Sequence, residues 1–291
     1  MDWPGMGCST RNTVQMKKLD WMCSLPAKLH SKKNPASNYA MFLARQVTDE
    51  FIDSLEDLRQ EEQLTEFVLA GHSLGGFLAA KYALKYPTHL SGLVLISPVG
   101  VPFPPPREEH ITTSQLDWRI RVLKNLWELN FTPQAIVRVA GSRGPELVKN
   151  AIDRRFAKQW EKEELQLLSD YLYQITVLPA QGEYSLNTLL EPVFVRSTNP
   201  QARRSYRSGV YAKEPLEQDL CKLGKIPLLL VYGDDDWLYY STVAETIQLW
   251  KKNNVDAELM MVSRAGHHLY TDNAREFNAG VLDWVKRKAL L

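Results

Sequence analysis

The sequence predicts an α/β fold in which a mostly parallel sheet is flanked by helices and interrupted by a helical cap. Short apolar runs alternate with stretches of helical periodicity up to about residue 101, and again from residue 226 onward. Strands and helices that alternate at this length form parallel sheets with right-handed crossovers. Between the two regions, a proline-rich run opens a long segment without that alternation. We therefore expect a core formed by residues 1–101 and 226–291, and a mainly helical cap at 102–225.

The first core segment begins with residues 1–40, which carry the Gly and Pro residues of an exposed loop and one short helical patch. Apolar residues then recur at helical spacing through 38–64, with charged residues between them, which predicts an amphipathic helix. Two short apolar runs, 67–70 and 93–96, predict buried strands. Residues 77–84 contain no helix breaker and predict a helix between those strands.

The cap and the second core segment follow the same rules of periodicity. Helices are expected in the cap near residues 114–130, 133–140, 145–159 and 161–178. The second core segment is expected to contain a strand at 227–232, a helix at 239–253, a strand at 258–262 and a last helix at about 273–289.

A Gly-x-Ser-x-Gly motif follows the first predicted strand and leads directly into a helix. This context is that of a nucleophile elbow, where a sharp turn exposes the hydroxyl of Ser73. Gly71 and Gly75 lack a Cβ and let the strand and the helix approach closely. The N–H of Leu74 lies at the start of the helix, where it can bind a developing oxyanion. His72, beside the nucleophile, is expected to pack in the elbow rather than to catalyse.

Three strand ends carry Ser73, Asp236 and His267 in that order along the chain. Sites in open parallel sheets form beyond the carboxyl ends of the strands, so these side chains are expected to meet. A serine needs a base within hydrogen-bond reach, a histidine supplies that base, and a buried carboxylate orients the histidine. The order Ser, Asp, His is the one that α/β-hydrolases use. The sequence therefore predicts a catalytic triad.

Each partner of the serine has neighbours that compete for its role. Asp234 and Asp235 directly precede Asp236 and could be turn acids in contact with solvent, or either could be the acid. We favour Asp236 because of its Gly-x-x-Asp spacing after the strand. His268 follows His267, and either could be the base. We favour His267 because the glycine before it lets the loop approach the serine closely.

Together these motifs resemble one branch of the α/β-hydrolases. The branch contains cardiolipin-specific deacylases, lysophosphatidic acid acyltransferases and their lipid-droplet relative that activates triglyceride lipase. The segments that carry the resemblance are the elbow 71–76, the Gly-Asp-Asp-Asp-Trp run 233–237, the pair His267-x-x-x-x-Asp272, the opening residues 2–11 and the cap segments 138–145 and 211–216. Residues 2–11 resemble the loop after the fourth strand of the branch.

The resemblance implies that Ser73 is the nucleophile, Asp236 the acid and His267 the base of a serine-dependent hydrolase or acyltransferase. Phospholipids or lysophospholipids are the implied substrates, with acyl-CoA as an acyl donor and no cofactor. Asp272 completes a His-x4-Asp motif that the branch associates with acyl transfer onto lysophosphatidic acid. Asp272 could instead be the N-cap or a first-turn acid of the last helix. Both roles could hold together.

The chain departs from the branch at its beginning, which corresponds to the end of the fourth strand. The His-Gly loop that supplies a second oxyanion-hole N–H is then expected to be absent, and losing one such donor costs on the order of 10²–10³ in rate. The strand at 67–70 is expected to form an exposed sheet edge. We expect either a shortened reading frame or an impaired product. The alternative function is a non-catalytic, lipid-associated partner protein.

Composition excludes several other classes of protein. Lys and Arg number 35 against 34 Asp and Glu, which gives no reason to expect nucleic-acid binding. Three widely spaced cysteines form neither a disulfide framework nor a metal motif, and favour a reducing compartment. No apolar run is long enough to span a bilayer.

The cap suggests peripheral membrane contact. Basic residues outnumber acids from 107 to 158, and segment 192–213 contains Lys and Arg but no acid, which suits an anionic lipid surface. An apolar helix face suited to a membrane interface would hold Trp118, Ile120, Leu123, Leu126 and Trp127. The resemblance implies a location at the mitochondrion, peripheral to its inner membrane, or alternatively in the cytoplasm and on lipid droplets.

Overall fold

The computed structural model describes residues 36–157, 159–196, 206–238 and 242–290. The chain divides into two compact units. Of the described residues, the sheet unit holds those of Ala44–Gln115 and Leu189–Leu291, and the helical unit holds those of Leu116–Thr188 together with 36–43. The predicted cap at 102–225 is thus shared between them, since residues 102–115 and the described residues of 189–196 and 206–225 belong to the sheet unit.

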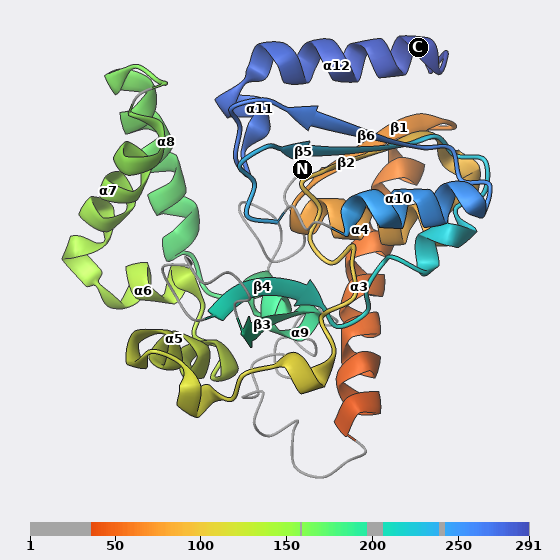
Figure 1. Cartoon of the computed structure of the whole chain (residues 1–291). Coiled ribbons are helices and arrows are strands. Elements are labelled where there is room, and N and C mark those ends of the chain that lie inside the picture. Colours follow the sequence, from red (N-terminus) through yellow and green to blue (C-terminus); the bar gives the residue numbers. More distant parts are fainter. Residues whose placement is uncertain (1–35, 158, 197–205, 239–241, 291) are drawn as a thin grey trace. The chain divides into compact units, whose positions relative to one another are not determined.

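A four-stranded parallel sheet forms the centre of the sheet unit (Figure 1). Its strands are β1 (Phe67–His72), β2 (Leu90–Ile96), β5 (Leu228–Gly233) and β6 (Ala257–Val262), in the order β1-β2-β5-β6. All three pairings are parallel, as the alternation of strands and helices predicts. Because the strands run in one direction, the turns after them meet at one edge of the sheet.

Helices cover both faces of this sheet. The helices are α3 (Ala36–Glu61), α4 (Leu74–Lys85), α10 (Val243–Lys252), α11 (Leu269–Asp272) and α12 (Ala274–Arg287). In Figure 1, α12 lies over one face, and α4 and α10 lie over the other. Alternate side chains of the strands supply the two cores: Val94 and Val231 pack with Trp284 of α12, whereas Leu93 and Leu230 point to the opposite face.

An antiparallel hairpin also belongs to the sheet unit. It is formed by β3 (Leu190–Arg196) and β4 (Tyr206–Ala212). The sequence analysis expected mainly helix here and missed both strands. The alternation of buried and exposed residues along these strands is short, and their buried cluster consists of Val193, Val195 and Tyr211. Pro192 also argues against a strand, because proline lacks an N–H.

The helical unit contains the four helices predicted for the cap. They are α5 (Trp118–Glu128), α6 (Pro133–Val139), α7 (Gly144–Phe156) and α8 (Lys162–Val177), followed by the short α9 (Ser185–Leu189). Side chains define their starts: Asp117 caps α5, Thr132 caps α6, and Glu161 forms a capping box on α8. Within the described residues, no helix combines the length and hydropathy needed to cross a membrane.

Two boundaries differ from the prediction. Helix α10 begins at Val243 rather than at 239, and residues 239–241 lie outside the described residues. The last helical region is two helices, and Asn273 caps the second by accepting a hydrogen bond from the Glu276 N–H. The interpretation of Asp272 as the N-cap of the last helix is therefore wrong. The opening residues 2–11 also lie outside the described residues.

Candidate active site

Ser73 stands on a sharp turn between β1 and α4. Its φ of 56° and ψ of −119° are strained for a residue with a side chain. A Cβ on Gly71 would lie 2.3 Å from the Gly75 carbonyl oxygen, so only glycine permits this approach of strand and helix. Leu74 opens α4, and its N–H is among those that no preceding helical carbonyl can accept. The local geometry is that of a nucleophile elbow.

The predicted triad residues meet at the carboxyl edge of the sheet. The Nε2 atom of His267 lies 3.0 Å from Ser73 Oγ, and its Nδ1 atom lies 3.2 Å from Asp236 Oδ1. Of the two neighbouring histidines, His267 makes the contact with the serine, and the His268 ring lies 5.5 Å from the His267 ring. The three groups form one chain of hydrogen bonds, in which His267 can take the proton of Ser73.

The carboxylate of Asp236 is buried, with a fully covered side chain. Burial alone would raise its pKa, but hydrogen bonding by His267, by Ser97 and by the Leu238 N–H outweighs burial and keeps the pKa below its ordinary value. The Leu238 N–H lies 2.9 Å from Oδ1. Ser97 Oγ and Asp236 Oδ2 are both buried without a well-formed hydrogen bond among the described residues. Asp236 is therefore held ionised, as an acid that orients a histidine must be.

The two other aspartates of this loop have different positions. Asp234 Oδ1 accepts a hydrogen bond from the Ala265 N–H at 3.1 Å, and Asp235 donates its N–H to the Ala265 carbonyl at 3.0 Å. A Cβ on Gly233 would lie 2.1 Å from that carbonyl oxygen, so the glycine allows the crossing. Hydrogen bonds from the Arg264 and Ala265 N–H groups lower the pKa of Asp234. Asp234 thus joins the aspartate loop to the histidine loop.

Asp272 also acts on the histidine loop. Its Oδ2 atom accepts a hydrogen bond from the Gly266 N–H at 2.9 Å. Gly266 directly precedes His267, so the carboxylate holds the backbone that carries the base. The structure therefore connects the two ends of the His-x4-Asp motif through the backbone.

His72 lies behind the base. Its Nε2 atom donates to the His267 carbonyl oxygen at 2.8 Å, which places the ring proton on Nε2. Burial lowers the pKa of His72 to about 4, since it outweighs the hydrogen bond to His267. The Tyr270 hydroxyl is 3.5 Å from Nδ1. His72 is therefore neutral near pH 7 and supports the loop, in keeping with the predicted packing role.

Sequence analysis did not single out three neighbours of the triad. Ser97 follows β2 and faces Asp236, Tyr270 contacts His72, and the Trp237 ring lies 5.3 Å from the His267 ring. Ser97 and Trp237 share one signal: each lies within four residues after a buried parallel strand. In the part of the chain that the structure describes, no three His, Cys, Asp or Glu side chains group as metal ligands would.

The sequence matches the family described as alpha/beta hydrolase fold over residues 1–274. It is 35% identical over 238 residues to a 1-acylglycerol-3-phosphate O-acyltransferase of Arabidopsis thaliana, covering 80% of this chain and 52% of the relative. It is 30% identical over 237 residues to a (lyso)-N-acylphosphatidylethanolamine lipase of Homo sapiens, covering 80% of this chain and 62% of that protein. The predicted resemblance to the lysophosphatidic acid acyltransferase branch is confirmed.

A solved structure shares the fold. It is that of a membrane phospholipase A, described as a novel bacterial virulence factor, and it aligns with a TM-score of 0.53 at 20% identity, covering 84% of this chain and 64% of that chain. At this identity the likeness concerns the fold alone. The chain spans about half the length of the first curated relatives it matches.

Proposed function

Because this chain belongs to the α/β-hydrolase fold family, we propose that it cleaves or transfers acyl groups of phospholipids or lysophospholipids. The observation that carries the proposal is the hydrogen-bonded chain from Ser73 through His267 to Asp236. The names of the relatives support the substrate class, since one is an acyltransferase and another a lipase acting on lipid substrates.

The reaction we propose has two halves. His267 Nε2 takes the proton as Ser73 Oγ attacks the carbonyl carbon of an acyl ester, and the N–H of Leu74 binds the oxyanion. The bond to the leaving alkoxide breaks, the alkoxide takes the proton from His267, and the acyl group remains on Ser73. In the second half, His267 deprotonates water or an acceptor hydroxyl as it attacks the acyl-serine. The bond to Ser73 Oγ then breaks, Oγ takes the proton back from His267, and a fatty acid or a new ester is released. An acyl-CoA donor would leave as the thiol instead.

Asp236 and Asp272 have different tasks in this scheme. Asp236 holds the Nδ1 proton of His267 and stabilises the imidazolium that forms. Asp272 is a positioning residue, because its hydrogen bond to the Gly266 N–H places the loop. We propose that this placement decides which acceptor reaches the acyl-serine, consistent with the motif's association with acyl transfer.

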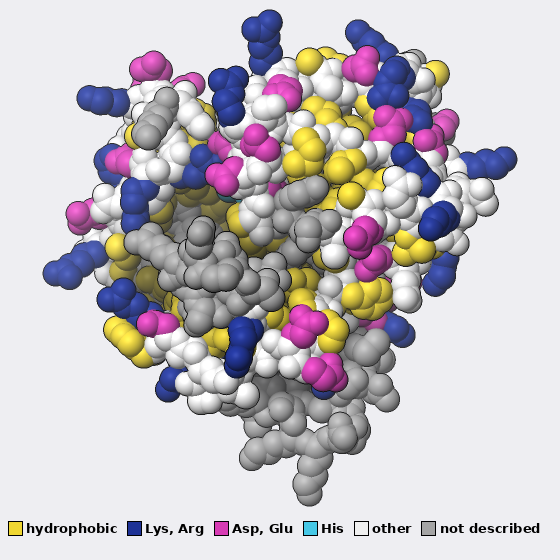
Figure 2. Space-filling view, viewed as in Figure 1, with side chains coloured by type: hydrophobic (Ala, Val, Ile, Leu, Met, Phe, Trp, Pro, Cys, Tyr) yellow, Lys and Arg dark blue, Asp and Glu magenta, His cyan; other side chains and the backbone are white. Residues whose placement is uncertain are grey.

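Membrane contact is part of the proposal. Helix α5 exposes 66% of Trp118 and 57% of Leu123, whereas Ile120, Leu126 and Trp127 of the predicted interfacial face are half-buried. On the face drawn in Figure 2, basic and acidic side chains of the described residues are interspersed, so the apolar side chains of α5 support the proposal better than charge does. The mitochondrial and lipid-droplet locations stay predictions.

Labelling with a fluorophosphonate tests the proposal directly, since the reagent reacts only with an activated serine. We expect the purified chain to be labelled and both Ser73→Ala and His267→Ala to abolish labelling. Ser54→Ala is the matched control, because its hydroxyl bonds only carbonyls of α3 in the described structure and its loss is expected to leave labelling unchanged. A folded chain that takes no label would overturn the proposed function.

A further inference from the structure

A cavity of about 750 Å³ in the sheet unit includes in its lining Trp237, whose ring contacts His267 of the candidate active site. The proline-rich loop after β2, the β3–β4 hairpin and the start of α10 form its walls. Its lining includes Phe103, Gly209, Tyr211, Glu217, Trp237 and Glu245. This volume is within the range of sites that hold small molecules.

Trp237 connects the cavity to the triad. It lines the cavity, its ring centroid lies 5.3 Å from that of His267, and it directly follows Asp236 in the chain. It is also 58% exposed, so its indole is accessible to a ligand. A molecule bound in the cavity would therefore contact a side chain that also contacts the candidate base.

Three aromatic residues line the cavity: Phe103, Trp237 and the buried Tyr211. Phe103 is 46% exposed, which leaves its ring accessible as well. Gly209 keeps room for the tyrosine, since a Cβ at that position would lie 2.7 Å from the Tyr211 ring. Aromatic faces bind cations, and quaternary ammonium groups are bound in sites of this kind.

Two acidic residues, Glu217 and Glu245, also line the cavity. Glu217 is held by neutral donors: the Phe103 N–H lies 3.3 Å from Oε2, and the Thr246 hydroxyl lies 3.2 Å from Oε1. These bonds fix the group without cancelling its charge. The described residues that line the cavity include no Lys or Arg, and no ion pair between described residues involves Glu217 or Glu245.

We propose that this cavity binds the ammonium end of a lipid head group, of the choline or ethanolamine class. The aromatic faces and the two carboxylates both favour a cation, and the apolar proline walls suit the methyl or methylene groups around it. The inference rests on the proposed function in one respect, that the ligand is a lipid.

Two other occupants fit the cavity less well. A head group with only a phosphate would meet two carboxylates of its own sign, which repel it. A bare acyl chain would remove the carboxylates from water and leave their charges without a partner, which is costly. The cavity therefore distinguishes zwitterionic lysophospholipids from lysophosphatidic acid.

Binding of n-dodecylphosphocholine, at concentrations below micelle formation, tests the proposal by calorimetric titration. Its matched comparison is dodecyl 3,3-dimethylbutyl phosphate, in which carbon replaces the ammonium nitrogen at nearly unchanged shape. We expect the ammonium compound to bind about tenfold more tightly to the full chain. Glu217→Gln and Trp237→Leu should each remove most of that preference, while Glu191→Gln, an exposed acid of β3 outside the cavity, should retain it.

Equal affinity for the two compounds would overturn the proposal, and so would a preference that survives both variants. Circular dichroism of each variant separates a lost site from a lost fold, and two different substitutions guard against either one failing to fold. Because dodecylphosphocholine carries no acyl ester, its binding does not require the triad. A failure of serine labelling and a failure of this binding are therefore separate results.

Discussion

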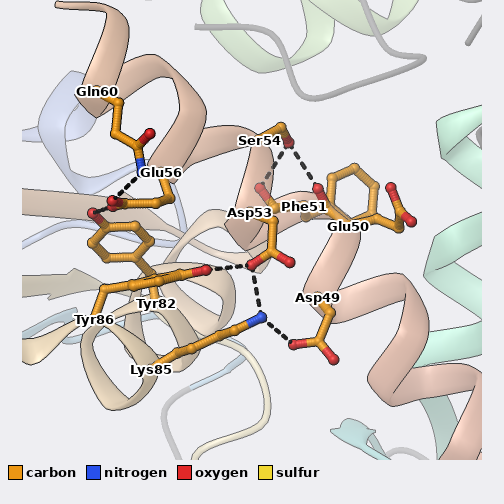
Figure 3. Close-up of polar contacts among 10 residues, drawn as sticks. All are labelled: Asp49, Glu50, Phe51, Asp53, Ser54, Glu56, Gln60, Tyr82, Lys85 and Tyr86. Atoms are coloured by element: carbon orange, nitrogen blue, oxygen red, sulfur yellow. Dashed lines mark hydrogen bonds and ion pairs between the residues drawn. The ribbon is translucent and has the colours of Figure 1, made fainter.

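Helix α4 has a cluster of polar side chains at each end, and the two clusters are built in opposite ways. At its N-terminus stands Ser73, beside His267. At its C-terminal end, Tyr82, Lys85 and Tyr86 meet side chains of α3 (Figure 3). One helix thus carries both a candidate reactive site and a purely structural contact between helices.

At the C-terminal end of α4, both carboxylate oxygens of Glu56 accept hydrogen bonds from neighbouring side chains. The carboxylate of Glu56 accepts bonds from Arg59 at 2.8 and 2.9 Å, from Gln60 at 3.0 Å and from the Tyr82 hydroxyl at 2.8 Å. Together these bonds outweigh burial and lower the pKa of Glu56 to about 2, with the Arg59 bond contributing most. A fully satisfied network of this kind fixes its side chains in one conformation, and its polar groups have no role in catalysis.

At the N-terminal end of α4, not every polar group has a hydrogen-bond partner within the helix. Ser73 has a strained backbone, and the N–H of Leu74 has no helical acceptor. Strain and unmatched polar groups persist where the surrounding structure enforces them, and they gather at functional sites. The contrast predicts that substitutions at one end change activity and that substitutions at the other change stability.

The largest effect is expected for Asp236→Asn. The amide keeps the shape of the side chain but cannot hold His267 with its proton on Nδ1, so the rate of fluorophosphonate labelling should fall by about 10³–10⁴-fold. Thermal unfolding should change little. A variant that is labelled at the normal rate would show that Asp236 does not orient the base.

Local sequence was sufficient to predict the elbow, because strand, turn and helix are adjacent in the chain. The sequence analysis also placed Asp236 ahead of Asp234, but the physical distinction is tertiary: one carboxylate meets the imidazole and the other meets the Ala265 N–H. The role of Asp272 was harder to predict from the sequence. Its partner is the backbone of Gly266, and Asn273 takes the capping role that the sequence analysis gave as one alternative for Asp272.

The β3–β4 hairpin and the cavity were not predictable from periodicity. The hairpin presents few buried residues on one face, and Pro192 obscures its pattern. The cavity brings together Phe103, Glu217 and Trp237 from three distant segments, and no local signal joins them. Sites of this kind depend on contacts between loops that are distant in the chain, and local sequence patterns do not reveal such contacts.

Glu56→Gln should have the next largest effect, this time on stability. It leaves Arg59 without its anionic partner, and we expect a loss of about 2 kcal/mol in the free energy of unfolding. Because the folded pKa is about 2 against an ordinary 4.5, the contribution of Glu56 is fully present above pH 4.5 and is lost as the pH falls toward 2. Urea denaturation between pH 2.5 and 7 measures both effects.

In this series Glu56→Gln should flatten the acid limb of the stability curve, while serine labelling at pH 7 stays near the wild-type rate. An unchanged acid limb would contradict the role given to Glu56. A large loss of labelling in a folded variant would contradict the separation of the two ends of α4.

His72→Gln should have a smaller effect that depends on pH. The folded pKa of His72 is about 4 against an ordinary 6.5, so the unfolded chain takes up a proton between these values and the folded chain does not. The shift alone would give roughly 3 kcal/mol, but the ring is only half-buried and solvent screens it, so wild-type stability should fall by about 1–2 kcal/mol from this group as the pH falls from 6.5 to 4. Glutamine retains an amide donor for the His267 carbonyl but does not titrate, so the variant should lack this part of the slope. Identical slopes in the two proteins would contradict the assignment.

The smallest effect is expected for Lys85→Met, at the structural end of α4. The ammonium group contacts Asp53 at 2.7 Å and Asp49 at 3.0 Å, but all three side chains are more than a third exposed, so water and salt screen the pairs. Methionine keeps the helix propensity and most of the aliphatic stem, and we expect a loss of about 0.5 kcal/mol that shrinks further in 1 M salt. Chemical denaturation at low and high salt measures it. A loss above about 2 kcal/mol would mean that this surface network, rather than the buried Glu56 cluster, joins α4 to α3.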